Sequence, residues 1–141
     1  MSTRVLVDSS VLLDILTEDP VWYSWSAATL AECAETSILA VNPVIYAEVS
    51  VGFERIEDVE KALPTGAFAR LPIPWEAAFL AGASFLKYRR AGGDKRAPLP
   101  DFFIGAHAVV ERMILVTRDA ARQRSYFPGL RLITPQRAAG E

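Results

Sequence analysis

The sequence contains very little cysteine and histidine. Among its 141 residues it has one of each, Cys33 and His107. A single cysteine cannot form an internal disulfide, which fits a reducing compartment, and a zinc site requires more thiolate or imidazole ligands than these two. Cys33 also falls near the end of a predicted helix, whereas reactive thiolates are favoured at helix starts. We therefore expect both residues to pack in the core rather than to act as a catalytic dyad.

Long uninterrupted hydrophobic runs are also missing. Asp8 and Asp14 interrupt the apolar N-terminus, so it lacks the pattern of a secretory leader. No later apolar stretch approaches the roughly 18 residues needed to cross a membrane. The length of 141 residues and the hydrophobic content of 51% suit one domain with a single substantial core. We expect a single cytoplasmic domain over residues 1–141, with no membrane association.

Basic residues are scarce in the first part of the chain. The net charge is only −2, which by itself does not indicate a nucleic-acid binder. Residues 1–86 contain 4 basic and 12 acidic side chains, whereas residues 87–141 contain 11 basic and 5 acidic ones. Either these arginines and lysines are spread over solvated helix faces, or they form a local positive surface for a polyanion.

Short apolar runs alternate with longer amphipathic segments along the chain. Four runs predict strands, at residues 4–8, 37–41, 113–117 and 130–134. The periodicity between them predicts helices at residues 10–19, 21–35, 42–54, 56–63, 75–91, from 101 onward and at 120–127. Asn42 and Pro43 are a strong helix-start signal, while the prolines between 64 and 74 indicate a loop. Strands that alternate with helices predict an α/β protein whose parallel sheet is covered on both sides.

Two acids follow predicted strands. Asp8 comes directly after "VLV", and Asp119 comes shortly after "ILVT". In an open parallel sheet the functional residues collect beyond the carboxyl ends of the strands, so these two side chains are expected at the same rim. Asp14, about a turn and a half beyond Asp8, is instead expected to be a solvated helix residue.

Two further acids interrupt apolar helix faces. Glu48 shares its face with Ile45 and Val51, and burying an unpaired carboxylate is costly. Asp101 opens a predicted helix whose small same-face residues would let it approach the sheet closely. Purely structural roles are also open for three of the acids. Asp8 and Asp101 are suitable helix caps, and Glu48 is a suitable partner for an arginine.

Four carboxylates at one rim would repel one another strongly. At about 4 Å and an effective dielectric of about 20, each close pair costs about 4 kcal/mol, so the cluster must bind protons or cations. Ligation by oxygen alone suits a hard ion such as Mg²⁺ or Mn²⁺. Such ions bridge to substrate phosphates, and the basic second half of the chain favours a phosphodiester substrate.

The acids lie in the segments "VLVDSSVLLDIL", "NPVIYAEVSVGF", "LPDFFIGAHA" and "LVTRDAARQRSYFPGLRLITP". In this order and spacing, over about residues 4–135, the segments resemble the PIN domain, most closely the VapC-type ribonuclease toxins of toxin-antitoxin modules. The resemblance implies a three-layer α/β/α sandwich with a central, mostly parallel sheet. It also implies endonucleolytic cleavage of RNA with Mg²⁺ or Mn²⁺, a homodimer, and inhibition by a cognate VapB-type antitoxin.

The resemblance also assigns site residues by position. The acidic constellation of the family is matched by Asp8, Glu48, Asp101 and Asp119, of which Asp8 and Asp101 are the expected direct metal ligands. Ser10 and Thr117 match the small polar positions beside the first and last acids. Many relatives carry a further acid soon after the third one, but "DFFIGAHA" offers none, so their second metal site is not matched here. The candidate phosphate contacts are Arg89, Arg90, Lys95, Arg96 and Arg118.

Two other functions fit the same elements. A phosphoacceptor receiver domain also places acids at the ends of parallel strands, but it normally has a lysine after a late strand, and no lysine follows Ile114. A non-catalytic RNA-binding module would carry stacking aromatics on a basic sheet face. Trp22, Tyr23 and Trp25 lie instead on a predicted helix in the acidic half, where we expect core packing or a subunit contact. The nuclease is the preferred interpretation, with these two as alternatives.

Overall fold

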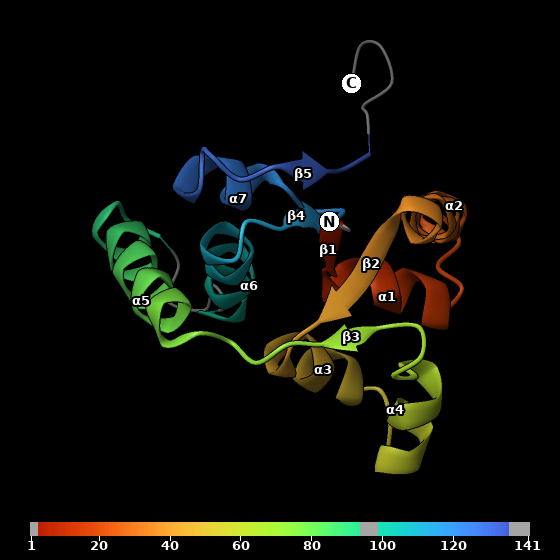
Figure 1. Ribbon diagram of the computed structural model, residues 1–141. Helices are drawn as coiled ribbons and strands as arrows, with labels where there is room; N and C mark the ends of the chain where they lie inside the picture. The colour runs from red at the N-terminus through yellow and green to blue at the C-terminus, as the bar shows by residue number, and fades with distance from the viewer. Residues whose placement is uncertain (1–2, 94–98, 136–141) are drawn as a thin grey trace.

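The described residues form five strands in one parallel sheet. A computed structural model describes residues 3–93 and 99–135. The strand order is β3-β2-β1-β4-β5, and every neighbouring pair runs parallel (Figure 1). The strands are β1 (Thr3–Val7), β2 (Ser37–Val41), β3 (Ala69–Arg70), β4 (Ile114–Val116) and β5 (Leu132–Ile133). The central strand β1 pairs with β2 through Val5 and Leu39, and with β4 through Leu6 and Leu115.

Helices cover both faces of this sheet. They are α1 (Ser9–Leu16), α2 (Tyr23–Thr36), α3 (Pro43–Ser50), α4 (Ile56–Ala62), α5 (Trp75–Arg90), α6 (Leu99–Val110) and α7 (Ala121–Tyr126). Figure 1 shows α2 on one side of the sheet and α6, backed by α5, on the other. The predicted α/β/α sandwich with a central parallel sheet is thus confirmed. Of the described helices the longest is α5, with 16 residues, and none is both long and apolar enough to span a membrane.

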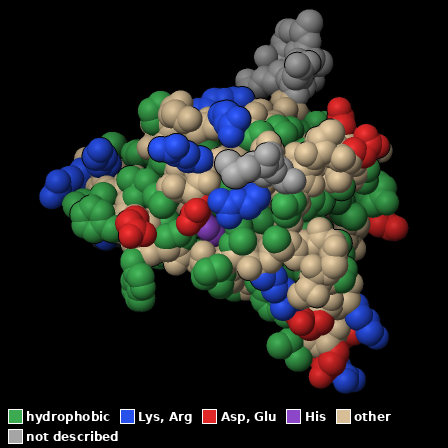
Figure 2. Space-filling view, in the orientation of Figure 1, with side chains coloured by type: hydrophobic (Ala, Val, Ile, Leu, Met, Phe, Trp, Pro, Cys, Tyr) green, Lys and Arg blue, Asp and Glu red, His purple; other side chains and the backbone are tan. Residues whose placement is uncertain are grey.

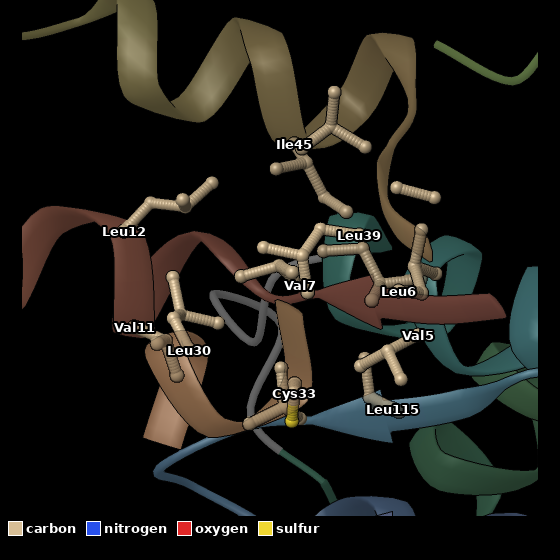
Figure 3. Packing of buried hydrophobic residues seen from close by; sticks show 14 of the residues in the cluster. Val5, Leu6, Val7, Val11, Leu12, Leu30, Cys33, Leu39, Ile45 and Leu115 are labelled. Carbon is tan, nitrogen blue, oxygen red and sulfur yellow. The ribbon is translucent and has the colours of Figure 1, made fainter. Parts of the chain in front are cut away.

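The central strand is buried on both faces. Val5, Leu6 and Val7 are at most 1% exposed. Figure 3 shows them packed among apolar side chains of α1, α2, α3 and β4, with Ile45 and Leu115 close by. Both faces of a strand can be apolar where both are covered, which explains the uninterrupted run in the sequence.

Several elements differ from the sequence prediction; α3, for example, ends at Ser50 rather than at residue 54. The loop predicted between residues 64 and 74 contains the strand β3, whose two residues pair with the end of β2 and are too few to show a hydrophobic period. Helix α6 begins at Leu99, two residues before Asp101, because a proline such as Pro100 is tolerated in the first turn of a helix. Helix α1 ends at Leu16 rather than at residue 19.

At Gly105, α6 lies close to α7 and the residue that follows it, whereas the sequence predicted a close approach to the sheet. A Cβ atom at position 105 would collide with the side chains of Gln123 and Phe127, so only Gly105 fits beside this part of the chain. Ala108, one turn further along α6, is fully buried in the core. Gln123 Nε2 in turn donates to the backbone oxygen of Asp101 at 2.9 Å. This packing brings the start of α6 next to α7.

Candidate active site

Asp8 connects the ends of two neighbouring strands. It follows β1, and its backbone N–H donates to the Val116 oxygen of β4 at 3.0 Å. Its Oδ2 atom accepts hydrogen bonds from Ser10 Oγ at 2.9 Å and from Thr117 Oγ1 at 2.7 Å. Although Asp8 occupies the N-cap position of α1, its side chain makes no capping hydrogen bond. The carboxylate is held at the rim of the sheet by two hydroxyls instead.

The segment after β4 brings Asp119 to the same rim. Thr117 is 1% exposed, and its Oγ1 accepts from the backbone N–H of Asp119 at 3.1 Å while it donates to Asp8. The backbone N–H of Arg118 donates to Ser10 Oγ at 3.3 Å. Asp119 itself is exposed to solvent. Through these hydrogen bonds, Ser10 and Thr117 link Asp8 to the segment that carries Asp119.

Glu48 reaches the site from α3. Its Oε1 atom accepts a hydrogen bond from Ser9 Oγ at 2.8 Å, and the side chain is half-buried. Burial raises the pKa of Glu48, the Ser9 hydroxyl opposes this, and the negative charge of Asp8 adds to the increase. No arginine within residues 3–93 or 99–135 forms an ion pair with Glu48. The hydroxyl of Ser9 is the partner that the structure provides.

Asn42 and His107 fix α3 against α6. Asn42 Oδ1 accepts from the Ile45 N–H at 2.9 Å and so caps α3, as the sequence predicted. Asn42 Nδ2 lies 3.0 Å from His107 Nδ1. His107 is fully buried, and burial lowers its pKa, which favours the neutral ring that accepts this hydrogen bond. The cross-link ties the helix of Glu48 to the helix of Asp101.

Asp101 lies in the first turn of α6 between a cation and the other acids. Its Oδ2 forms an ion pair with Arg122 Nη1 of α7 at 2.6 Å. Burial raises the pKa of Asp101 to about 6, and the negative charge of Asp8 contributes more to this than Arg122 removes. Glu48 and Asp119 add smaller contributions in the same direction. The four predicted acids are therefore close enough for the charges of the other three to act on Asp101.

The chemistry of these side chains fits a hard cation. Burial also raises the pKa of Asp8, with smaller opposing effects from its hydroxyl partners. Ionised carboxylates in this site therefore cost free energy, and a bound cation would lower that cost. Carboxylate oxygens are the ligands that Mg²⁺ prefers, and this ion often takes only one or two of them and keeps several waters. Within residues 3–93 and 99–135, no three acidic, imidazole or thiol groups converge into a ready metal site. The donor set thus suits an ion bound partly through water.

Two of the arginines predicted to contact phosphate lie on α5. Arg89 and Arg90 are exposed in its last turn, and Figure 2 shows basic side chains at the outer end of this helix. Lys95 and Arg96 lie outside the described residues. A basic side chain that was not predicted, Arg122, contacts Asp101 directly.

The prediction that Asp14 is solvated is wrong. Asp14 is 2% exposed, and Arg118 donates to it through Nε and Nη2, each at 3.0 Å. Ser26 Oγ of α2 also donates to it, at 2.8 Å. The spacing in the sequence does indicate this burial, because Asp14 lies three residues after the fully buried Val11 and so shares its face of α1. Arg118, predicted to contact phosphate, is bound to this carboxylate.

Two partners of the acids were missed altogether. Ser9 donates to Glu48, and Arg122 pairs with Asp101. In each case the two partners lie on different helices. A periodic pattern shows which face of an element is buried, but it does not show which side chain of another element lies opposite. Cys33 is 9% exposed in the core cluster, so it packs as expected.

Comparisons with known proteins add to this geometry. The profile of the PIN domain family matches residues 5–127. A comparison with curated protein sequences found no match. Among solved structures, a chain of VapBC2 from Rickettsia felis bound to a promoter DNA fragment has a TM-score of 0.72 at 17% identity, covering 95% of this chain and 100% of that chain.

Two further structures cover most of the chain. A chain of a toxin-antitoxin complex from Klebsiella pneumoniae has a TM-score of 0.69 at 21% identity, covering 95% of this chain and 99% of that one. The PIN domain endonuclease Utp24 has a TM-score of 0.54 at 14% identity, covering 95% and 86%. At such identities the structures show the fold alone. Because the family profile matches most of the sequence, this chain belongs to the PIN domain family.

Proposed function

We propose that this chain is a single-domain endoribonuclease that requires Mg²⁺ or Mn²⁺ and acts as the toxin of a type II toxin-antitoxin system. The observation that carries the proposal is the electrostatic interaction of four acids from four separate elements. Asp8 follows β1, Glu48 lies on α3, Asp101 lies on α6 and Asp119 follows β4. Burial, with a smaller contribution from the charges of the other three acids, raises the pKa of Asp101 to about 6, and a bound cation would relieve this cost of holding the carboxylates ionised. Membership of the PIN domain family supports a nuclease.

Each acid has a role in this proposal. Asp8 and Asp101 hold the metal ion, and Glu48 and Asp119 bind it directly or through water. When bound, the ion polarises the scissile phosphate and lowers the pKa of an attached water. The hydroxyls that donate to Asp8 hold it in place without neutralising it, so its charge remains available to a cation.

Among residues 3–93 and 99–135, Arg122 is the basic side chain best placed to contact a substrate phosphate near the acids. Its Nη1 pairs with Asp101 at 2.6 Å, and its guanidinium lies 5.3 Å from the centre of the Tyr88 ring. The side chain is 31% exposed, and a guanidinium has five N–H donors. It can therefore keep its contact with Asp101 and donate to a phosphate oxygen at the same time. The excess of basic residues after residue 86 supports RNA as the substrate.

The alternatives account for fewer of these observations. A receiver domain would need a lysine close to its acids, and the last lysine of the chain is Lys95, before Asp101 and Asp119. A non-catalytic RNA-binding module would have no use for carboxylates that raise one another's pKa. Neither alternative explains why four helices and strands direct acids to one rim.

We further propose that the chain binds a VapB-type antitoxin and a second copy of itself. The structural relatives named above include chains of a VapBC2 complex and of a toxin-antitoxin complex. On α5, Trp75 is 89% exposed, Phe79 80% and Leu86 47%, and Figure 2 shows hydrophobic side chains protruding at this edge of the molecule. Residues spaced by four and seven line one side of a helix, and an exposed apolar strip of this kind indicates a protein contact.

Cleavage of RNA by purified protein, freed of any antitoxin, tests the proposal. We expect cutting with Mg²⁺ or Mn²⁺ and none after chelation. Sequencing the cleavage ends after brief induced expression would then identify the RNA that is cut. Cutting that persists in excess EDTA, in a homogeneous sample, would refute the metal-dependent mechanism.

A further inference from the structure

A buried ion pair lies beside the acids of the candidate site. Asp14 of α1 is 2% exposed, and Arg118 binds both of its oxygens, with Nε to Oδ2 and Nη2 to Oδ1 at 3.0 Å each. Ser26 of α2 donates to Oδ2 at 2.8 Å. The guanidinium also lies over the Trp22 ring, 5.4 Å from its centre. The pair thus joins the segment after β4 to α1 and α2, which lie side by side in Figure 1.

The backbone of Arg118 is connected to the proposed metal ligands. Arg118 stands between Thr117, whose hydroxyl donates to Asp8 at 2.7 Å, and Asp119, whose N–H donates to that hydroxyl at 3.1 Å. Its own N–H donates to Ser10 Oγ at 3.3 Å, and Ser10 donates to Asp8 at 2.9 Å. A shift of the Arg118 backbone would therefore disturb the hydrogen bonds that place both strand-end acids.

The geometry of the pair restricts where Arg118 can lie. A guanidinium that donates two hydrogen bonds to one carboxylate is fixed in orientation as well as in distance. Asp14 cannot give up this partner cheaply, because its charge is buried and a buried charge without a partner is strongly destabilising. Arg118 is 33% exposed and Asp14 only 2%, so the buried carboxylate fixes the position of the more exposed guanidinium.

We propose that Asp14 is a positioning residue of the nuclease site. Through Arg118 it fixes residues 117–119, and so determines where Asp8 and Asp119 meet a divalent cation. Asp14 does not ligate the ion in this scheme, because Arg118 and Ser26 bind its two oxygens. The inference rests on the proposed function, and its test includes a measurement that does not depend on metal.

The test compares Asp14→Asn with wild type and with Arg4→Gln in the full chain. Arg4 pairs with Glu111 at 3.4 Å near the opposite, amino end of β1, so Arg4→Gln removes an ion pair far along the strand from the acids. Two quantities are measured: Mn²⁺ affinity by electron paramagnetic resonance, and hydrogen exchange at the amides of Asp8 and Asp119 in metal-free protein.

Asp14→Asn is expected to weaken Mn²⁺ binding about 10-fold, as loss of a group that orients a metal ligand commonly does, and to speed exchange at both amides. Arg4→Gln should change neither quantity. Adding Arg118→Gln to Asp14→Asn should cause little further loss, because both changes remove the same interaction. Mn²⁺ affinity and exchange equal to those of wild type would overturn the proposal.

Ser26→Ala provides a milder variant should Asp14→Asn fail to fold. It removes one hydrogen bond to Asp14 and keeps the ion pair. We therefore expect a smaller loss of Mn²⁺ affinity and a smaller increase in amide exchange than for Asp14→Asn. Wild-type values for this variant would overturn the positioning role. A wild-type protein that binds no Mn²⁺ and cuts no RNA would instead refute the nuclease, and the exchange difference of Asp14→Asn would persist.

Discussion

Replacing Asp101 with asparagine is expected to stabilise the protein when no divalent cation is present. Burial and the charges of neighbouring acids raise the pKa of Asp101 from 3.8 to about 6, despite its ion pair with Arg122. Ionisation of this carboxyl therefore costs free energy in the folded protein. Asparagine resembles the neutral acid in shape and removes that cost. Because the raised pKa already includes the attraction of Arg122, the loss of this ion pair needs no separate correction.

The magnitude follows from the pKa. A shift from 3.8 to about 6 corresponds to about 3 kcal/mol at neutral pH, because each unit is worth about 1.4 kcal/mol. The side chain is 31% exposed, and solvent screening reduces the figure to about 1 kcal/mol. For a chain of this length, that difference raises the melting temperature by about 3 °C.

The effect should also depend on pH. Because the folded pKa lies above the unfolded value, the folded state holds the proton more tightly, and the stability of wild type falls as pH rises toward and through 6. The advantage of Asp101→Asn should be greatest at pH 7.5 and should fall to about a third by pH 4.5. Added Mg²⁺ should stabilise wild type more than the variant, because it binds only the folded site.

Thermal unfolding in EDTA, at both pH values, measures this difference. Glu57→Gln is the matched control, because Glu57 is 61% exposed and pairs with Arg55 at the surface, where loss of an ion pair costs almost nothing. If Asp101→Asn is less stable than wild type by the same amount at both pH values, its ion pair with Arg122 outweighs the repulsion. The reasoning about the acid cluster would then be refuted.

Three further outcomes are expected. Gly105→Ala should destabilise the protein by about 2 kcal/mol, because its Cβ would collide with side chains at α7; an unchanged urea midpoint would contradict this packing. Replacing Arg89 and Arg90 with glutamine should weaken RNA binding for all sequences and flatten its salt dependence, whereas an unchanged slope would show that they are only solvated. Trp75→Glu should shift the protein toward monomer in light scattering at micromolar concentration, and a monomeric wild type would argue against the α5 contact.

The fold could be predicted where local hydrophobicity decides it. The run at 37–41 coincides with β2 because a covered parallel strand is apolar on both faces. Helix α3 begins where Asn42 and Pro43 predict, since the amide of Asn42 caps it. Strand β3 could not be predicted, because its two residues are held by pairing with β2 rather than by a pattern of their own.

In the candidate site, too, the sequence predicts features that depend on local pattern and misses those that depend on contacts between elements. The location of Asp8 follows from chain order, because parallel strands end at one rim and Asp8 directly follows such a strand. Asp14 has the same side chain a few residues later, but the partner of its buried carboxylate, Arg118, lies 104 positions away in the sequence. The partner of Glu48 is likewise 39 positions away. Contacts of this kind become visible only when the elements are placed in space.

The most direct test of the central claim is an RNA cleavage assay of wild type and Asp8→Asn, each with Mg²⁺, with EDTA, and with Mg²⁺ restored in excess. Wild type should cut with Mg²⁺, stop in EDTA and resume when Mg²⁺ is restored. Asp8→Asn should be nearly inactive throughout, although its metal-free form is at least as stable as wild type, because burial raises the pKa of this carboxyl and the variant removes its charge. Normal cleavage by a destabilised Asp8→Asn protein would show that Asp8 is a local structural residue and that the metal site lies elsewhere.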